Sequence, residues 1–286
     1  MMSRIGIIGG SGLYQIEGIK NIKTVYVETP FGHPSDGYVT GTLEGCDVIF
    51  LPRHGRGHRL LPTEVPYRAN IFGMKKLGVS HIISVSAVGS LREDYVPTDS
   101  VIIDNFFDRS NQARPHTFFG DGIVAHVQMA HPVCEKLRQV LLTAANEINA
   151  RVKDGGVYLN MEGPQFSTLA ESQTYRQWGM DVIGMTQMSE ARLAREAEIC
   201  YATIAQVTDF DCWHEEIGDT VSVNGIIEVM HKNTETAKEI ITRAIPKISD
   251  TECDCKDALA ISFITDKSLW PAETVEKLRP ILEKYL

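Results

Sequence analysis

The sequence predicts an α/β fold built as a single domain, and three observations lead to this prediction. Short apolar runs rich in β-branched residues recur along the chain, and segments with apolar residues at helical spacing lie between them. Strands that alternate with helices are typical of α/β proteins. The chain also contains no repeat, low-complexity tract or linker that would divide its 286 residues. One domain spanning residues 1–286 is therefore expected.

Seven runs are expected to form strands, because they are short, continuous and apolar, as strands covered on both faces usually are. The first run opens the chain and stops at the glycine pair Gly9-Gly10. In chain order, the runs cover residues 5–8, 47–51, 81–86, 100–103, 156–161, 181–185 and 200–207.

Six segments are expected to form helices. The first, at residues 67–77, has Lys75 and Lys76 late in the pattern and is followed by Gly78. Basic residues in the last turn and a glycine just beyond it are typical of a helix end. The other helical segments are residues 132–148, 169–178, 189–197, 222–245 and 272–286.

Charge and hydropathy exclude several classes of protein. The formal net charge is −9 at pH 7, whereas general nucleic-acid binders are usually basic. No stretch approaches the ~20 apolar residues needed to cross a bilayer. The apolar start, residues 1–8, is too short for a signal-peptide core. We therefore expect a cytoplasmic protein with neither a nucleic-acid nor a membrane partner.

The six cysteines are expected to be reduced, buried thiols, as is usual in a chain of this length. One pattern is less ordinary, because Cys253-Asp254-Cys255 places two cysteines in a polar stretch. Metal sites more often use Cys-x-x-Cys with a second ligand pair, and no such pair is evident, so no metal site is predicted. Whether Cys253 and Cys255 form a disulfide stays an open question, since intracellular disulfides occur in some thermophile proteins.

The most informative motif is the pair of carboxylates Asp209 and Asp211, which follows the apolar run at residues 200–207. Acids at the carboxyl end of a strand in an α/β sheet fall where such sheets bind ligands. An acid there can carry a proton to a leaving group or hydrogen-bond an exocyclic amine. The alternative is a solvated turn in which Asp209 caps a helix.

Glycines and small polar residues follow two other expected strands. The run Gly6 to Gly12 resembles an anion-binding turn, in which backbone N–H groups approach a phosphate. It is neither a dinucleotide loop, since Gln15 stands where a third glycine is needed, nor a P-loop, since no Gly-Lys-Ser/Thr ending is present. The run Ser84 to Leu91 could supply hydroxyl and N–H donors to the same anion, and it lacks the pattern of a serine-hydrolase elbow.

A basic segment follows the expected strand at residues 47–51. Residues 52–59 contain three arginines and two histidines, and these side chains donate charge-assisted hydrogen bonds to oxyanions. A basic surface loop is the alternative. A metal pair formed by His54 and His58 is disfavoured, because the surrounding glycines oppose the helix that would align them.

Two later segments carry side chains that could contact a flat ring and a sugar. In residues 161–168, the aromatic ring of Phe166 stands beside hydroxyls and could stack on a flat ring. In residues 184–188, Met185 could lie under a sugar and Thr186 could reach the anion.

Taken together, these motifs resemble the trimeric purine nucleoside phosphorylase family, and most closely its members that act on 5′-methylthioadenosine. The matches run in order from about residue 4 to residue 245. They are Gly9-Gly10-Ser11-Gly12, Thr29-Pro30-Phe31-Gly32, Arg53-His54-Gly55, Tyr67-x-Ala69-Asn70, Ala87-x-Gly89-Ser90, Glu162-Gly163-Pro164-x-Phe166-Ser167, Gly184-Met185-Thr186 and Thr208-Asp209-Phe210-Asp211-Cys212-Trp213.

The resemblance implies a central mixed β-sheet flanked by helices, a homotrimer, and phosphorolysis with inorganic phosphate as a co-substrate and no cofactor. By motif, it implies that phosphate binds to Ser11, Arg53, His54, Ser86, Ala87 and Thr186. It also implies that the nucleoside binds to Phe166, Ser167, Met185, Asp209, Asp211, Val223, Ile226 and Ile227, with His126 contributed by a neighbouring subunit.

The chemistry expected from this resemblance follows from charge. Asp209 would share or deliver a proton at N7 of the purine, while Arg53 and His54 would hold the phosphate that captures the ribosyl cation. Asp211 would accept from a 6-amino group, so a 6-oxopurine leaves a buried acceptor unpaired. Three alternatives are a broader phosphorylase acting on adenosine, inosine or methylthioinosine, a nucleoside-binding module without turnover, and a Rossmann oxidoreductase, which Gln15 disfavours.

Overall fold

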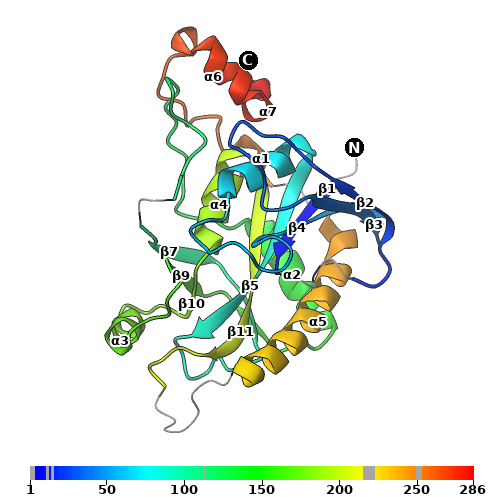
Figure 1. The fold of residues 1–286 in the computed structure, drawn as a ribbon, viewed down its shortest axis with the longest axis vertical. Helices are drawn as coiled ribbons and strands as arrows, with labels where there is room; N and C mark the ends of the chain where they lie inside the picture. Colours follow the sequence, from blue (N-terminus) through cyan, green and yellow to red (C-terminus); the bar gives the residue numbers. More distant parts are fainter. Residues whose placement is uncertain (1–3, 11–12, 14–15, 112–113, 215–222, 249–252) are drawn as a thin grey trace.

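The computed structural model describes residues 4–10, 13, 16–111, 114–214, 223–248 and 253–286, with backbone alone for residues 223–227 (Figure 1). The predicted α/β architecture with a mixed sheet is confirmed. The predicted Ser11 site lies outside the described residues, and so do the side chains of Val223, Ile226 and Ile227.

The sheet is organised around β5 (Val79–Ser90), which pairs with three strands. Its first half runs parallel to β1 (Arg4–Gly9), and β1 in turn runs parallel to β4 (Cys46–Pro52). Its other edge runs parallel to β11 (Cys200–Phe210) along almost the whole strand. Its last residues pair antiparallel with β10 (Val182–Gly184), so the sheet divides where β5 ends.

The remaining strands extend the sheet outward from this centre. The pairs are β3 beside β4, β2 beside β3, β9 beside β10, β7 beside β9, β6 beside β11 and β8 beside β6. Their bounds are Lys20–Val25 (β2), Tyr38–Leu43 (β3), Ser100–Ile102 (β6), Asn105–Arg109 (β7), Val152–Asp154 (β8) and Val157–Met161 (β9).

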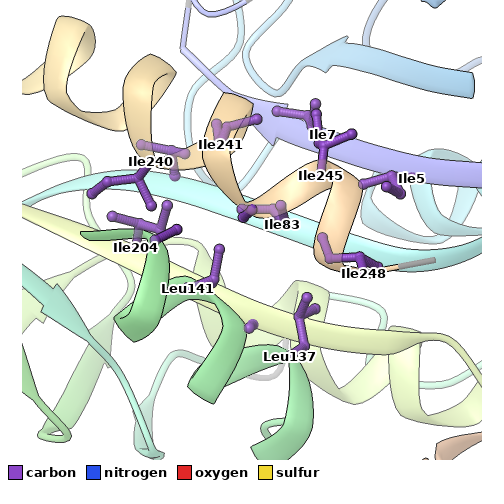
Figure 2. Packing of buried hydrophobic residues seen from close by; sticks show 14 of the residues in the cluster. Ile5, Ile7, Ile83, Leu137, Leu141, Ile204, Ile240, Ile241, Ile245 and Ile248 are labelled. Carbon is purple, nitrogen blue, oxygen red and sulfur yellow. The ribbon is translucent and has the colours of Figure 1, made fainter. Parts of the chain in front are cut away.

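Two pairs of helices cover the central strands. On one face lie α2 (Glu135–Glu147) and α5 (Val223–Ile248), and on the other lie α1 (Tyr67–Lys76) and α4 (Gln187–Glu196). Side chains of a strand alternate between faces. Ile5 and Ile7 of β1 therefore lie in the cluster on the α2 and α5 face, beside isoleucines of α5 (Figure 2), whereas Ile8 belongs to the cluster on the α1 and α4 face.

The outlying helices are shorter. Helix α3 (Leu169–Gln177) begins with a capping box, in which Thr168 and Glu171 satisfy each other's backbone N–H groups. The prediction of one helix over residues 272–286 is wrong. The segment forms α6 (Ala272–Lys277), α7 (Arg279–Leu282) and a 3₁₀ turn, because Pro280 has no N–H to continue the helix from the preceding turn.

Two further 3₁₀ turns, at Asp254–Asp257 and Lys267–Leu269, lie between α5 and α6. In the described part of the chain, none of the helices has both the length and the apolar character that crossing a membrane requires.

Candidate active site

The carboxyl end of β11 lies against the end of β5, and this pairing assembles the site. Asp209 is in register with Gly89, and Ile183 of β10 meets Gly89 from the other side. The register skips one residue between Val207 and Asp209, so Thr208 forms a β-bulge. Bulges re-aim side chains next to active sites. Asp209 is thus part of the strand, and the alternative of a solvated capping turn is wrong.

The two aspartates differ in their surroundings. The hydroxyl of Thr208 donates to Oδ1 of Asp209 at 2.5 Å. Burial raises the pKa of Asp209, the hydrogen bond from Thr208 lowers it, and the charge of Asp211 raises it, with a net upward shift. Asp211 is buried, and among the described residues its Oδ2 has no hydrogen-bond partner. A buried acceptor of this kind fits a ligand donor.

The Arg53 guanidinium is held in a buried ion pair with Glu190 of α4. Its Nε and Nη2 donate to the carboxylate, Nη2 also donates to Ser84 Oγ at 2.6 Å, and Nη1 donates to the Val85 carbonyl at 3.0 Å. Four of the five N–H donors of an arginine are thereby used among the described residues. One N–H on Nη1 is left to face an anion.

His54 is neutral at pH 7. Burial, followed by the charge of Arg53, lowers its pKa to about 4. Nδ1 lies 2.8 Å from the Leu60 carbonyl, which can only accept, so Nδ1 carries the proton and Nε2 is an acceptor. The charged donation expected from the sequence is therefore not available in the free protein. A neutral His54 can instead accept a hydrogen bond from a phosphate O–H.

Two hydroxyls of the expected phosphate site lie on neighbouring elements. Ser86 of β5 contacts the hydroxyl of Tyr158 at 3.3 Å, and Ala87, beside it, is exposed. Thr186 is buried at the start of α4, where a helix N-terminus favours anions.

Gln187 orients the Thr186 hydroxyl. The side-chain carbonyl of Gln187 accepts from Tyr201 at 2.5 Å and from Thr203 at 3.1 Å, which fixes the amide so that its nitrogen donates to Thr186 Oγ1 at 3.2 Å. Because Thr186 already accepts there, its own proton is available for a phosphate oxygen.

A buried arginine fixes the expected ribose and base segments. Arg114 donates to the side chain and the carbonyl of Glu162 at 2.8 and 2.6 Å, and to the Met185 carbonyl at 2.6 Å. The turn that contains Gly163 passes close to the Met185 side chain. A Cβ on Gly163 would lie 2.4 Å from Met185 Sδ, and the φ of 71° also requires glycine.

The base turn also touches the aspartate segment. Cys212 Sγ lies 3.3 Å from the Ser167 carbonyl, and Ser167 Oγ lies 4.0 Å from the sulfur of Met161. The ring of Phe166 is 78% exposed, so a large apolar face is open for stacking. The Cys212 contact thus joins Ser167 to the aspartate segment. Met185 directly precedes Thr186 of the expected phosphate site.

His126 is not joined to this group by any contact that the described residues make. It is exposed, and its N–H donates to the Ser262 carbonyl at 2.8 Å. Two surface cavities, of about 270 and 660 Å³, are lined by none of the predicted site residues. The second lies where α5 passes residues 148–151.

Three site residues were not predicted from the sequence: Arg114, Gln187 and Glu190. Each is buried and makes its key contact with a residue far away in the chain or on another element. No local pattern marks Arg114. The one signal for the other two is their spacing, because Gln187 and Glu190 stand about one helical turn apart, in line with Ala191 and Ala194 on the face that α4 buries.

Comparisons with known proteins agree with this geometry. The sequence model of the Phosphorylase superfamily matches residues 4–246, and the chain belongs to that superfamily. Within it, the chain is 58% identical to the S-methyl-5′-thioadenosine phosphorylase of Geobacter sulfurreducens, over 99% of both chains.

Two solved structures are also similar. A methylthioadenosine phosphorylase from an Antarctic soil metagenomic library is 48% identical, with a TM-score of 0.93 over 98% of this chain and 99% of that one. A mutant adenosine/methylthioadenosine phosphorylase from Schistosoma mansoni, in complex with methylthioadenosine, is 35% identical, with a TM-score of 0.84 over 94% and 100% of the two chains. The resemblance inferred from the motifs is confirmed.

The Arg53–Glu190 pair predicts a large loss of stability on removal of one partner. Glu190→Gln leaves a buried guanidinium charge uncompensated, which costs about 3–5 kcal/mol of unfolding free energy. Thermal and denaturant unfolding at pH 6 measure this loss.

Glu196→Gln is the matched control, because Glu196 is also a buried acid on α4. Burial raises the pKa of Glu196 to about 7, so at pH 6 this carboxyl is mostly protonated and neutral, as glutamine is. We expect a loss of about 1 kcal/mol or less. Equal losses in the two variants would contradict a special role for the ion pair.

Proposed function

We propose that this protein is an enzyme that cleaves 5′-methylthioadenosine with inorganic phosphate, giving adenine and 5-methylthioribose 1-phosphate. The observation that carries the proposal is the aspartate pair at the end of β11. Asp209 has a raised pKa, and Asp211 presents a buried, unpartnered Oδ2. The first suits proton donation to a leaving base, and the second suits an exocyclic amino group.

The reaction follows from where charge develops. As the C1′–N9 bond breaks, its electron pair goes to the purine, and the ribosyl carbon becomes cationic. Asp209 gives its proton to N7, which neutralises the departing base. A phosphate oxygen forms the new bond to C1′. We assign the phosphate to Arg53, Ser86 and Thr186, with His54 accepting from the phosphate O–H and with Ser11 and Ala87 completing the site.

The choice of base rests on Asp211. A 6-amino group donates to Oδ2 and satisfies it, whereas a 6-oxo group places an acceptor against an acceptor. Leaving a buried group unpaired costs about 1–3 kcal/mol. Adenine nucleosides are therefore preferred over inosine and methylthioinosine.

The 5′ substituent is assigned to an apolar pocket from Val223, Ile226 and Ile227. The relatives named S-methyl-5′-thioadenosine phosphorylase support the methylthio group. Adenosine is the second candidate substrate, because a structural relative is named an adenosine/methylthioadenosine phosphorylase.

The assembly we propose is a homotrimer in which His126 completes the 5′ end of a neighbouring site. Its exposure in the single chain suits that role. We also propose that catalysis needs phosphate as co-substrate but no cofactor, and the cytoplasmic location stays a prediction. Light scattering tests the trimer, and a monomer mass would leave His126 without a site.

Release of free base tests the function. Methylthioadenosine, adenosine and inosine are each incubated with and without phosphate. Phosphate-dependent adenine release, fastest from methylthioadenosine, is expected. If none of the three releases its base, a nucleoside-binding module becomes the leading interpretation.

Asp209→Asn removes the transferable proton while keeping the shape of the side chain. We expect kcat to fall about 10²- to 10⁴-fold, the usual contribution of general acid catalysis. Phosphate affinity, measured by calorimetry, should stay within a few-fold, since among the described residues Asp209 makes its side-chain hydrogen bond with Thr208 and with none of the assigned phosphate residues. An unchanged kcat would remove Asp209 from the mechanism.

Asp211→Asn replaces the acceptor with an amide that can donate to a 6-oxo group. The ratio of kcat/KM for adenosine over inosine should fall about 5- to 160-fold, as expected for about 1–3 kcal/mol. Cys212→Ser is the neighbouring control, and it should leave the ratio unchanged. A ratio that does not move in Asp211→Asn would mean that another residue contacts the 6-position.

Thr208→Val tests how the pKa of Asp209 is set. Asp209 acts as an acid, so the rate falls as pH rises through its pKa. The hydrogen bond from Thr208 lowers that pKa. Its removal should therefore raise the pKa and move the alkaline limb of the kcat/KM profile to higher pH. Thr117→Val, which removes a hydrogen bond to Glu196 instead, should not move the limb.

A further inference from the structure

Four of the six cysteines come together away from the aspartate pair. The sulfur atoms of Cys134, Cys200, Cys253 and Cys255 all lie within 4.8 Å of one another. Cys134 precedes α2, Cys200 begins β11, and the other two follow α5. Three of the side chains are buried and that of Cys253 is half-buried. The fold thus gathers thiols from three distant parts of the chain.

The mutual spacing of the sulfurs fits a shared ion. Four thiolates at about 2.3 Å from a tetrahedral zinc ion lie about 3.8 Å from one another. A disulfide needs sulfurs about 2.05 Å apart, and all four residues are free thiols. Two disulfides would need only two close pairs, whereas here every sulfur is near the other three.

Two contacts beside the cluster suit thiolate ligands. Nη1 of Arg195 lies 3.8 Å from Cys255 Sγ, within reach of a hydrogen bond to sulfur. Cys134 stands at the N-cap of the 13-residue helix α2, where the helix dipole stabilises a thiolate. The N–H of Cys134 donates to the Tyr201 carbonyl at 2.8 Å, which fixes this ligand beside β11. Outer contacts of this kind orient metal ligands.

We propose that Cys134, Cys200, Cys253 and Cys255 form a structural site for one zinc ion. Soft thiolate ligands select zinc among the common divalent ions. Binding replaces four S–H protons, which leave to the solvent, and gives a site of net charge −2 that Arg195 partly offsets. Four protein ligands leave no position open for a substrate, so the ion holds structure and takes no part in catalysis.

This site differs from what the sequence spacing predicts. The Cys-x-Cys pair at residues 253–255 has no second pair nearby in the sequence, because its partners lie at positions 134 and 200. The site ties the chain after α5 to the amino end of β11. Asp209 lies nine residues along that strand, or about 30 Å away at 3.3 Å per residue.

Metal analysis of the full-length protein, purified under reducing conditions from zinc-supplemented cells, tests the proposal. We expect about one zinc per chain, as for a closed four-cysteine site. The double variant Cys200→Ser with Cys255→Ser should lose it. Cys212→Ser, which changes an exposed cysteine outside the cluster, should retain it.

Two measurements on the unaltered protein keep the test valid if the double variant does not fold. Replacement by Co²⁺ should give the sulfur-to-cobalt charge-transfer band and intense visible bands of a tetrahedral thiolate site. A strong zinc chelator should lower the Tm, and one equivalent of Zn²⁺ should restore it.

Three results would overturn the proposal. The first is a protein that is free of zinc and gives no cobalt bands after full reduction. The second is a pair of disulfides among the four cysteines, detected by mass spectrometry, in a protein that binds no metal when reduced. The third is zinc that persists at one per chain in a folded double variant.

Discussion

The parallel pairing of β11 with β5 is the constraint on which the rest of the structure depends. It runs from Cys200 beside His81 to Phe210 beside Ser90. Side chains along the middle of β11, such as those of Ile204 and Val207, are fully buried. A strand buried on both faces cannot slip by one residue without turning its side chains to the wrong face. The register therefore fixes the aspartates at one end and a thiol at the other.

The elements that the sequence predicts well are those with the strongest burial. All seven apolar runs are strands, because continuous apolar segments need cover on both faces. The four strands that were not predicted carry polar residues and lie towards the margins of the sheet. β2, for example, reads Lys-Asn-Ile-Lys-Thr-Val and is mostly exposed. Pairing with a neighbour, rather than burial, makes such a segment a strand.

The candidate site is predicted in part. The motifs at residues 53–54, 84–90, 184–186 and 208–213 lie at or beside the ends of β4, β5, β10 and β11. Of these strands, β4, β5 and β11 run in one direction, which gathers their carboxyl ends at one edge, whereas β10 runs antiparallel to β5. The bulge at Thr208 is not visible in the sequence, because it arises from a mismatch between two strands. The same holds for Glu190, which meets Arg53 across 137 positions of the chain. Protonation is harder still to predict, since the neutral state of His54 depends on burial and on the charge of Arg53, and its tautomer depends on the Leu60 carbonyl.

Trp213 gives the site a natural optical reporter. Its ring is buried two residues beyond Asp211, its Nε1 donates to the Ser90 carbonyl at 2.8 Å, and the Arg176 guanidinium lies 3.4 Å from its ring centroid. An indole held between a fixed cation and a strand end emits according to the local electric field. The chain has three tryptophans, and the other two lie beyond α3 and before α6. With Trp178 and Trp270 replaced, the fluorescence of Trp213 would follow the arrival and departure of a base at the site we propose, without any added label.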